Sequence, residues 1–208
     1  SRVRKQVREK QIEKSPRTFR SAVNYLNSLT NYEQRSRTPY NTTNFGLTRI
    51  QKILRALDNP HRKFKSLHVA GTKGKGSTAA MLSEMLRGCG LKVGLYTSPH
   101  ILDIRERIVA NGHPISENDF ARAVWNVADV TEEAKVTGPT YFEVMTAAAF
   151  HYFAEEGVEI AVVETGLGGR LDATNVLSPE VVGITSISFD HMAELGTSLE
   201  AIAAEKAG

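Results

Sequence analysis

The stretch LHVAGTKGKGSTAAML, residues 67–82, decides the fold of this 208-residue chain. A short apolar run over 66–70 leads into a glycine-rich turn over 71–76, and a helix-forming segment follows from about 77 to 87. Backbone N–H groups in such a turn, together with the positive end of the following helix, favour binding of a polyphosphate. The stretch therefore predicts a strand, a phosphate-binding loop and a helix, in that order.

The residues of this turn carry the groups that a polyphosphate needs. The candidate nucleotide-binding residues are Gly71, Thr72, Lys73, Gly74, Lys75, Gly76, Ser77 and Thr78. Lys75 can place a positive charge against the terminal phosphates, and Ser77 or Thr78 can offer a hydroxyl to phosphate or Mg²⁺. The strict pattern G-x-x-x-x-G-K-[ST] is not met, because Val69 replaces its first glycine and Gly76 separates Lys75 from Ser77. A glycine-rich turn that merely lets a helix pack closely stays open as an alternative.

Strand-like and helix-like segments alternate around the turn. Further strands are expected at 92–97, 159–165 and 181–187, with a small hairpin at 108–115 that turns at Asn111-Gly112. Helices are expected at 19–29, 47–57, 116–135 and 140–157, and a last one opening at Thr197 with Glu200. The runs 159–165 and 181–187 are largely apolar and rich in β-branched residues, which is typical of strands buried on both faces. We therefore predict a P-loop-containing α/β fold with a mostly parallel sheet flanked by helices.

Composition excludes several classes of protein. The chain is 41% hydrophobic and 24% charged, as expected for a globular domain. No window approaches ~18 uninterrupted apolar residues, and no apolar run follows the positive start SRVRKQVREKQIEK, so neither a membrane span nor a signal peptide is expected. The single cysteine, Cys89, cannot form an internal disulfide. We expect a cytoplasmic protein without a membrane partner.

The net charge of +3 conceals an asymmetry along the chain. Residues 1–65 carry 16 Lys and Arg against 4 Asp and Glu, whereas residues 66–208 carry 10 against 19. A basic arm of this kind could bind nucleic acid. No aromatic or glycine pattern of RNA-binding modules accompanies the charge, however, so nucleic acid is not the expected partner. We interpret residues 1–44 as a basic N-terminal leader with one possible helix, ahead of a phosphate-binding part at 45–208.

Polar residues gather where the expected strands end, at 71–78, 97–100, 164–175 and 188–191. Ligands of parallel sheets bind at this edge. Glu164 ends one strand, His191 follows another and Ser98 follows a third, so a carboxylate, an imidazole and a hydroxyl could share one cation. Each also has an ordinary explanation: an ion pair or cap for Glu164, a hydrogen-bonded structural imidazole for His191, and a turn for Ser98.

The spacing G-T-K-G-K-G-S-T resembles the ATP loop of the Mur ligase superfamily, and within it that of folylpolyglutamate and dihydrofolate synthases. Three further segments carry this resemblance: TSPHILDIRERI at 97–108, ETGLGGRLDATN at 164–175 and SFDHMAELGTSLEAIAAEKAG at 188–208. The resemblance covers roughly 45–208 and none of 1–40. It implies that 45–208 is the N-terminal part of an ATP-binding domain, with the C-terminal domain of such enzymes absent, so that the chain alone would be inactive.

The resemblance also assigns roles to residues around the metal. It implies that Ser98, Glu164 and His191 hold Mg²⁺. Lys206 matches a lysine that is carbamylated in many members of the family and would then supply a further metal ligand, although a helical lysine is ordinarily solvated. Lys75, Glu164, His191 and Lys206 are accordingly the expected catalytic residues.

On the substrate side, the resemblance implies contacts to a pterin from Phe142, Asp172 and Ala173. Phe142 could equally pack at a helix start, and Arg107 looks like an ion-pairing residue as often as a substrate residue.

The activity implied by the resemblance is ATP-dependent formation of an amide in folate biosynthesis. L-Glutamate would be joined to the carboxylate of a folate or of dihydropteroate through an acyl phosphate, with ATP and Mg²⁺ required. The expected partners are these small molecules, and we expect a monomer. Two alternatives stay open. One is a different Mur-type ligase that joins an amino acid to another carboxylate, and the other is a P-loop module whose basic N-terminus binds nucleic acid.

Overall fold

A computed structural model describes residues 16–33 and 41–208. Within them the chain forms a six-stranded sheet with the order β4-β3-β2-β5-β1-β6. The strands are β1 (Lys65–Ala70), β2 (Val93–Tyr96), β3 (Ile108–Ala110), β4 (His113–Pro114), β5 (Ile160–Glu164) and β6 (Val181–Ile184). Strands β2, β5, β1 and β6 run parallel, and β3 with β4 adds an antiparallel hairpin at one edge. The predicted α/β fold with a mostly parallel sheet is confirmed.

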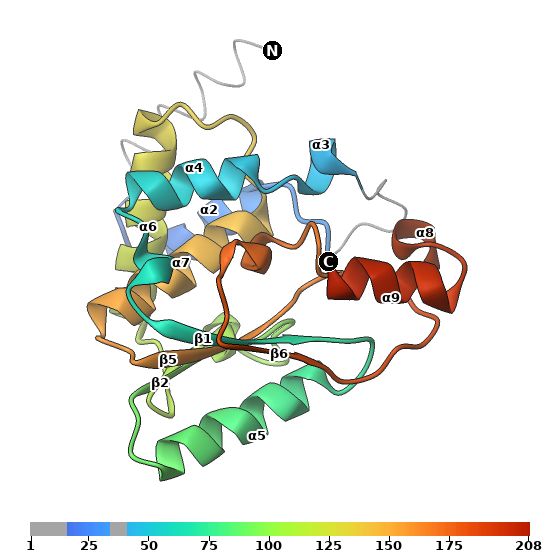
Figure 1. The fold of residues 1–208 in the computed structure, drawn as a ribbon. Coiled ribbons are helices and arrows are strands. Elements are labelled where there is room, and N and C mark those ends of the chain that lie inside the picture. Colours follow the sequence, from blue (N-terminus) through green and yellow to red (C-terminus); the bar gives the residue numbers. More distant parts are fainter. Residues whose placement is uncertain (1–15, 34–40) are drawn as a thin grey trace.

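Helices cover both faces of this sheet. The α-helices are α2 (Phe19–Ser28), α3 (Thr42–Phe45), α4 (Thr48–Ala56), α5 (Lys75–Gly88), α6 (Glu117–Glu133), α7 (Tyr141–Glu155), α8 (Met192–Leu195) and α9 (Leu199–Ala207), and short 3₁₀ turns are η1 (Pro60–Arg62), η2 (Ile104–Arg107) and η3 (Ala173–Val176). Helix α5 lies alone on one face, and α2, α4, α6 and α7 gather over the other (Figure 1). Helices α8 and α9 lie beside the end of the sheet where β1 passes into α5. In the described part of the chain, no helix is both long and apolar enough to cross a membrane.

Side-chain caps set the helix starts. The hydroxyl of Ser116 accepts from the N–H of Asp119 at the start of α6, and Thr140 with Glu143 forms a capping box at the start of α7, as the spacing predicts. The start of α9 differs from the prediction, because Ser198 rather than Thr197 is the cap. The short helices α3 and α8 were not predicted, since four residues are too few to show a helical period.

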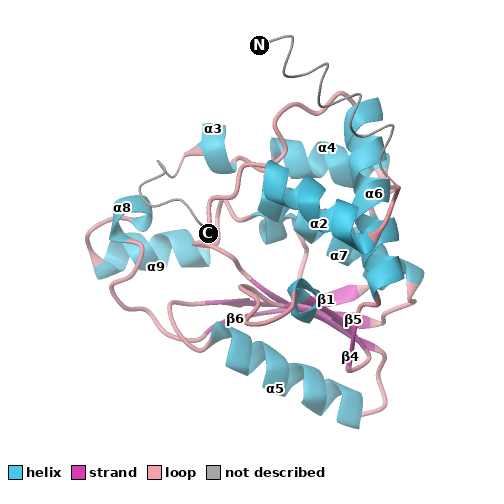
Figure 2. Cartoon of the chain, turned by 180° about the vertical axis from the view of Figure 1, so that it is seen from behind, coloured by secondary structure: helices cyan, strands magenta, loops and turns pink. Residues whose placement is uncertain are grey.

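The main core lies between the sheet and the layer formed by α2, α4, α6 and α7. The view from behind also shows this helix layer over the sheet (Figure 2). The largest fully buried side chains of the core include Tyr96, Phe120, Phe150 and Phe153. Helix α2 adds the buried residues Ala22 and Leu26. The predicted division of the chain at residue 44 stays a prediction, but α2, on the N-terminal side of it, already packs into this core. A smaller cluster that includes Val69, Ala79 and Val162 fills the space under α5.

Strand β6 corrects one expectation. In β5, Ala161, Val162 and Val163 are fully buried, whereas Val181 and Val182 in β6 are 60% and 56% exposed. Both runs are strands, as predicted, but burial on both faces holds for β5 and is wrong for β6. The physical reason is sheet order: β5 lies between β1 and β2, while β6 pairs with β1 at the edge of the described sheet. A local sequence pattern indicates a strand without revealing its neighbours.

Candidate active site

The phosphate loop, residues 71–78, links the end of β1 to the start of α5. Helix α5 begins at Lys75, two residues earlier than predicted, so its N-terminal end lies inside the motif. Gly71 has a φ of 142°, and a Cβ at this position would lie 2.0 Å from Thr185 Oγ1. A side chain here would meet both backbone strain and a steric clash, which explains the glycine.

A segment that follows β6, residues 185–188, holds the loop in place. The N–H of Thr72 donates to the Ser186 carbonyl at 2.7 Å, and the hydroxyl of Thr185 donates to the Lys73 carbonyl at 2.8 Å. The N–H of Ser188 donates to Thr72 Oγ1 at 3.1 Å. We did not predict these contacts, although a run of hydroxyl residues at the end of an expected strand was a visible signal. The loop is thus fixed by hydrogen bonds before any ligand binds.

Glu164 lies at the centre of the charged part of the site. Its Oε1 lies 3.8 Å from Lys75 Nζ, and its Oε2 accepts a hydrogen bond from the N–H of Ser98 at 3.1 Å. Burial raises the pKa of Glu164, because a buried carboxylate loses hydration, while Ser98 and Lys75 act in the opposite direction. A Cβ at Gly76 would lie 3.3 Å from Oε2, so the glycine lets α5 approach the carboxylate. The structure brings Lys75, Ser98 and Glu164 together.

Lys206 is buried rather than solvated. Its Nζ donates to the Gly71 carbonyl at 2.8 Å, which attaches α9 to the phosphate loop. Burial, together with the nearby charge of Lys75, lowers the pKa of Lys206. The resemblance singled this lysine out as a carbamylated metal ligand, which stays a prediction. The expectation from sequence pattern alone, a solvated helical lysine, is wrong because Lys206 is 6% exposed.

His191 is the N-cap residue of α8 and has a left-handed backbone conformation, with a φ of 47°. Its side chain is 53% exposed, and its Nε2 lies 3.9 Å from Asp190 Oδ2. It lines the same cavity as Lys75 and Ser98. The imidazole is therefore at the site but is less enclosed than the carboxylate of Glu164.

A cavity of about 810 Å³ lies in front of the phosphate loop. Six of the predicted site residues line it: Lys75, Ser98, Phe142, Asp172, Ala173 and His191. These residues come from five separate segments of the chain, and they meet at the carboxyl end of the parallel strands. The structure therefore brings these six predicted residues together at one cavity, and their roles stay predictions.

One wall of the cavity is aromatic, and sequence reasoning missed most of it. The rings of Tyr32 and Phe45 lie 4.7 Å apart between centroids. Phe142, at the start of α7, lies over Gly166 so closely that a Cβ there would be 2.6 Å from its Cζ. Tyr32 and Phe45 belong to a stretch with the composition of a loop, which gives no periodic pattern to read.

Arg107 is an ion-pairing residue in this structure. Its guanidinium donates two hydrogen bonds of 2.8 Å to Glu33, and its Nε donates to His100 Nδ1 at 2.9 Å. The group is 2% exposed and lies over the ring of Tyr141. Arg107 therefore ties the segment that bears Tyr32 and Glu33 to the loop that bears Ser98.

Asp172 is buried at the start of η3 and organises the turn around it. Its Oδ2 accepts from the N–H of Leu167 at 2.8 Å, and its Oδ1 accepts from the N–H of Thr174 at 3.0 Å and from the Thr174 hydroxyl. Burial raises the pKa of Asp172, and these donors act against that rise. The carboxylate is thereby fixed at the cavity wall.

The donor set fits a divalent cation that prefers oxygen ligands. Glu164 offers a buried carboxylate next to Ser98, and His191 lines the same cavity. The described residues contain no group of three His, Cys, Asp or Glu that could hold a metal by themselves. Magnesium commonly completes its ligand shell with water and substrate phosphates, so this incomplete set is suitable. Within the described chain, the buried hydroxyls of Thr165 and Ser188 also lack a hydrogen-bond partner.

Comparison with known proteins identifies the class. Residues 69–208 match the Mur ligase middle domain. The chain belongs to the Mur ligase family. Its relatives include the dihydrofolate synthase/folylpolyglutamate synthase of Bacillus subtilis, which is 46% identical over 167 residues, covering 78% of this chain and 39% of that protein. A folylpolyglutamate synthase of Arabidopsis thaliana is 41% identical over 198 residues, covering 92% of this chain and 32% of that protein.

Solved structures give the same result. An FPGS–AMPPCP–folate complex matches with a TM-score of 0.82 and 36% identity, covering 92% of this chain and 45% of that one. E. coli FolC in complex with DHPP and ADP matches with a TM-score of 0.80 and 33% identity, covering 92% of this chain and 43% of that one. The chain thus spans less than half the length of these relatives. The family and fold predicted from the motifs are confirmed.

Proposed function

We propose that the protein bearing this chain is an ATP-dependent ligase that joins L-glutamate to a folate-type carboxylate, on dihydropteroate, a tetrahydrofolate polyglutamate or both. One observation carries the proposal: the phosphate-loop lysine and an aromatic substrate-sized cavity belong to one site, with the buried Glu164 beside them. The names of the relatives from B. subtilis and A. thaliana support this assignment. So do solved neighbours that contain an ATP analogue with folate, or ADP with DHPP.

The proposed reaction has two balanced steps. An oxygen of the substrate carboxylate attacks the γ-phosphorus of ATP, the bond to the β–γ bridging oxygen breaks, and ADP leaves. The amine nitrogen of glutamate then attacks the acyl carbon and loses a proton, and phosphate leaves with the electrons of the C–O bond. No side-chain nucleophile takes part. The physical difficulty is that an anionic carboxylate must approach an anionic triphosphate.

This chain offers several groups that reduce that repulsion. The backbone N–H groups of the phosphate loop and the N-terminal end of α5 would hold the phosphates, and Lys75 would face the transferred group. Ser98, Glu164 and His191 would hold Mg²⁺, which supplies positive charge that offsets the phosphate oxygens. Within this set Glu164 must be ionised, and Lys75 at 3.8 Å favours that state despite burial.

We propose further that Lys206 is carbamylated. Its neutral amine nitrogen would attack the carbon of CO₂ and lose a proton, which gives an anionic carbamate. The lowered pKa of Lys206 supports this step, since a larger fraction of the amine is then neutral. A carbamate would also replace a like charge near Lys75 with an opposite one. Intact mass measurement under CO₂ should show one added CO₂ that Lys206→Arg abolishes, and an unmodified wild type would contradict the assignment.

On the substrate side, the aromatic wall with Phe142 would stack on a flat heterocycle, and Asp172 and Ala173 would contact its edge. L-Glutamate as the second substrate, a monomeric state and a cytoplasmic location belong to the same proposal. The location is open to test in particular, because relatives from cattle and humans are named as mitochondrial.

A phosphate-release assay on the full-length enzyme tests the function. Dihydropteroate, tetrahydrofolate and a UDP-muramoyl substrate are each supplied with ATP, Mg²⁺ and the matching amino acid. Turnover with a folate-type substrate is expected, and turnover with the muramoyl substrate alone would overturn the proposal. Steeply salt-dependent nucleic-acid binding that disappears on deleting residues 1–20 would favour the P-loop module instead. That segment falls mostly outside the described residues.

A further inference from the structure

We propose that His68 is a positioning residue for Asp172: through the hydroxyl of Thr174, it fixes the carboxylate that lies at the substrate cavity. The inference rests on the proposed function only in assigning the folate-type substrate to that cavity. Nothing in the motifs singled out His68, which lies inside the apolar run of β1.

Three buried side chains form one chain of hydrogen bonds. His68 Nε2 lies 2.8 Å from Thr174 Oγ1, and that hydroxyl donates in turn to Asp172 Oδ1. His68 is 5% exposed and Thr174 is fully buried. Strand β1 is paired on both sides, with β5 and β6, so the backbone of His68 is held firmly. These two hydrogen bonds therefore connect the strand that leads into the phosphate loop to the turn that lines the substrate cavity.

The direction of each hydrogen bond follows from proton counting. A threonine hydroxyl has a single proton, and Thr174 gives it to Asp172. The same Asp172 oxygen also accepts from the N–H of Thr174 at 3.0 Å, which indicates an acceptor rather than a protonated oxygen. Thr174 Oγ1 must then accept from His68, so His68 carries its proton on Nε2. Burial lowers the pKa of His68 to about 4, and the ring is therefore neutral near pH 7.

This arrangement matters because Asp172 needs its donors. Burial raises the pKa of Asp172, and its hydrogen bonds, the largest of them from the Thr174 side chain, act against that rise. The charge of Asp172 also interacts with three nearby titratable groups: Tyr96, Glu164 and Lys206. Without His68, the Thr174 hydroxyl is free to turn away. The carboxylate then loses one of its donors and is held only by backbone N–H groups, among them those of Leu167 and Thr174. A displaced or protonated Asp172 would accept hydrogen bonds poorly from the N–H groups of a flat heterocycle.

Kinetics on the full-length enzyme test the inference. His68→Leu and Thr174→Val should each raise the KM for the folate-type substrate about tenfold while the KM for ATP stays within twofold, because each breaks the series of hydrogen bonds that ends at the buried Asp172 carboxylate. The double variant should be no worse than either single one, since both break the same chain. Thr174→Ser restores the hydroxyl and should recover most of the loss. Thr131→Val, at a buried threonine of α6, is the matched control and should leave both constants unchanged.

A second measurement does not depend on turnover. Nitrogen NMR of a histidine-labelled enzyme should show His68 as the Nε2–H tautomer, with no titration between pH 5 and pH 8. An Nδ1–H tautomer, or equal rises in both KM values, would overturn the inference. If the wild type turns over no folate-type substrate, the proposed function fails, and the tautomer still decides the hydrogen-bond chain by itself.

Discussion

The two walls of the cavity are built in different ways. The phosphate wall contains Lys75, which belongs to one continuous motif, residues 71–78. The backbone of this motif is hydrogen-bonded to 185–188. The aromatic wall combines Tyr32 and Phe45 with Phe142, which lies far from them in the sequence. Under the proposed function, the first wall would bind the phosphates of ATP and the second the flat ring of the organic substrate. We therefore expect changes on the first wall to reduce kcat and changes on the second to raise a single KM.

The largest effect is expected at Lys75. Lys75→Ala should lower kcat on the order of 10²- to 10³-fold, because one charge facing the transferred phosphoryl group is lost. The fold should persist, since the side chain is only partly buried and its ion-pair distance to Glu164 is long at 3.8 Å. Steady-state phosphate release and thermal melting check the two statements.

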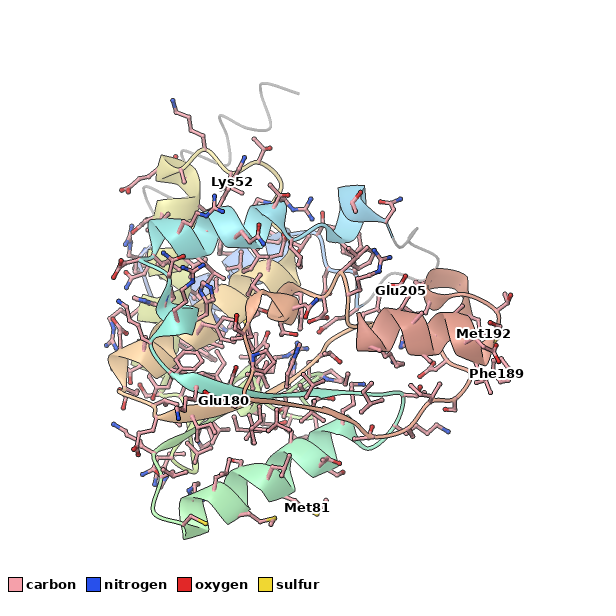
Figure 3. The ribbon with its side chains drawn as sticks, in the orientation of Figure 1. Lys52, Met81, Glu180, Phe189, Met192 and Glu205 are labelled. Carbon is pink, nitrogen blue, oxygen red and sulfur yellow. The ribbon has the colours of Figure 1, made fainter. Side chains whose placement is uncertain are left out.

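Lys52 supplies the matched control for this change. It is an exposed lysine on α4, on the opposite side of the molecule from α5 (Figure 3). Lys52→Ala should leave kcat unchanged. If Lys75→Ala also turned over near normally, the phosphate wall would have been assigned to the wrong residue.

The next effect concerns the metal. Glu164→Gln keeps the size of the side chain but removes its charge, so the Mg²⁺ concentration for half-maximal activity should rise at least roughly tenfold. Saturating Mg²⁺ should restore part of kcat. Glu180→Gln, at an exposed carboxylate just before β6, is the control and should leave the titration unchanged (Figure 3). A Mg²⁺ titration of Glu164→Gln identical to that of wild type would argue against a ligand role.

A smaller effect is expected on the aromatic wall. Phe142→Ala removes a ring that lines the cavity and should raise the KM for the folate-type substrate about tenfold, with the KM for ATP unchanged. Phe142→Leu keeps an apolar side chain and should give an intermediate value. A fall in kcat with both KM values constant would mean that Phe142 acts in the chemical step, as the phosphate wall does. It would contradict the expected difference between the two walls.

The contrast between the walls also explains what the sequence could predict. The phosphate loop could be predicted because its glycines and Lys75 lie within one short stretch, 71–76, and each has a local physical role. Glu164, Ser98 and His191 were found because they follow strands, and parallel strands bring their ends together. Tyr32, Phe45 and the buried state of Lys206 depend on tertiary packing, which leaves no local pattern. The exposure of β6 was missed for the same reason, since Val181 and Val182 resemble the buried valines of β5 in type.

The last and smallest prediction concerns pH and His68, the buried residue of the strand that leads into the phosphate loop. The pKa of His68 falls from 6.5 when unfolded to about 4 when folded, so the unfolded chain binds the proton more readily in this interval. Stability should therefore be complete above pH 6.5 and decline as pH falls toward 4, with a loss of roughly 1 kcal/mol or less between pH 7 and pH 6. His68→Gln should flatten this slope in thermal unfolding, while the slope from His61, whose pKa is also lowered to about 4, remains. If His68→Gln left the slope of stability against pH unchanged, His68 would be charged or accessible to solvent in the folded protein. The hydrogen bonds from His68 through Thr174 to Asp172 would then lack the neutral imidazole donor.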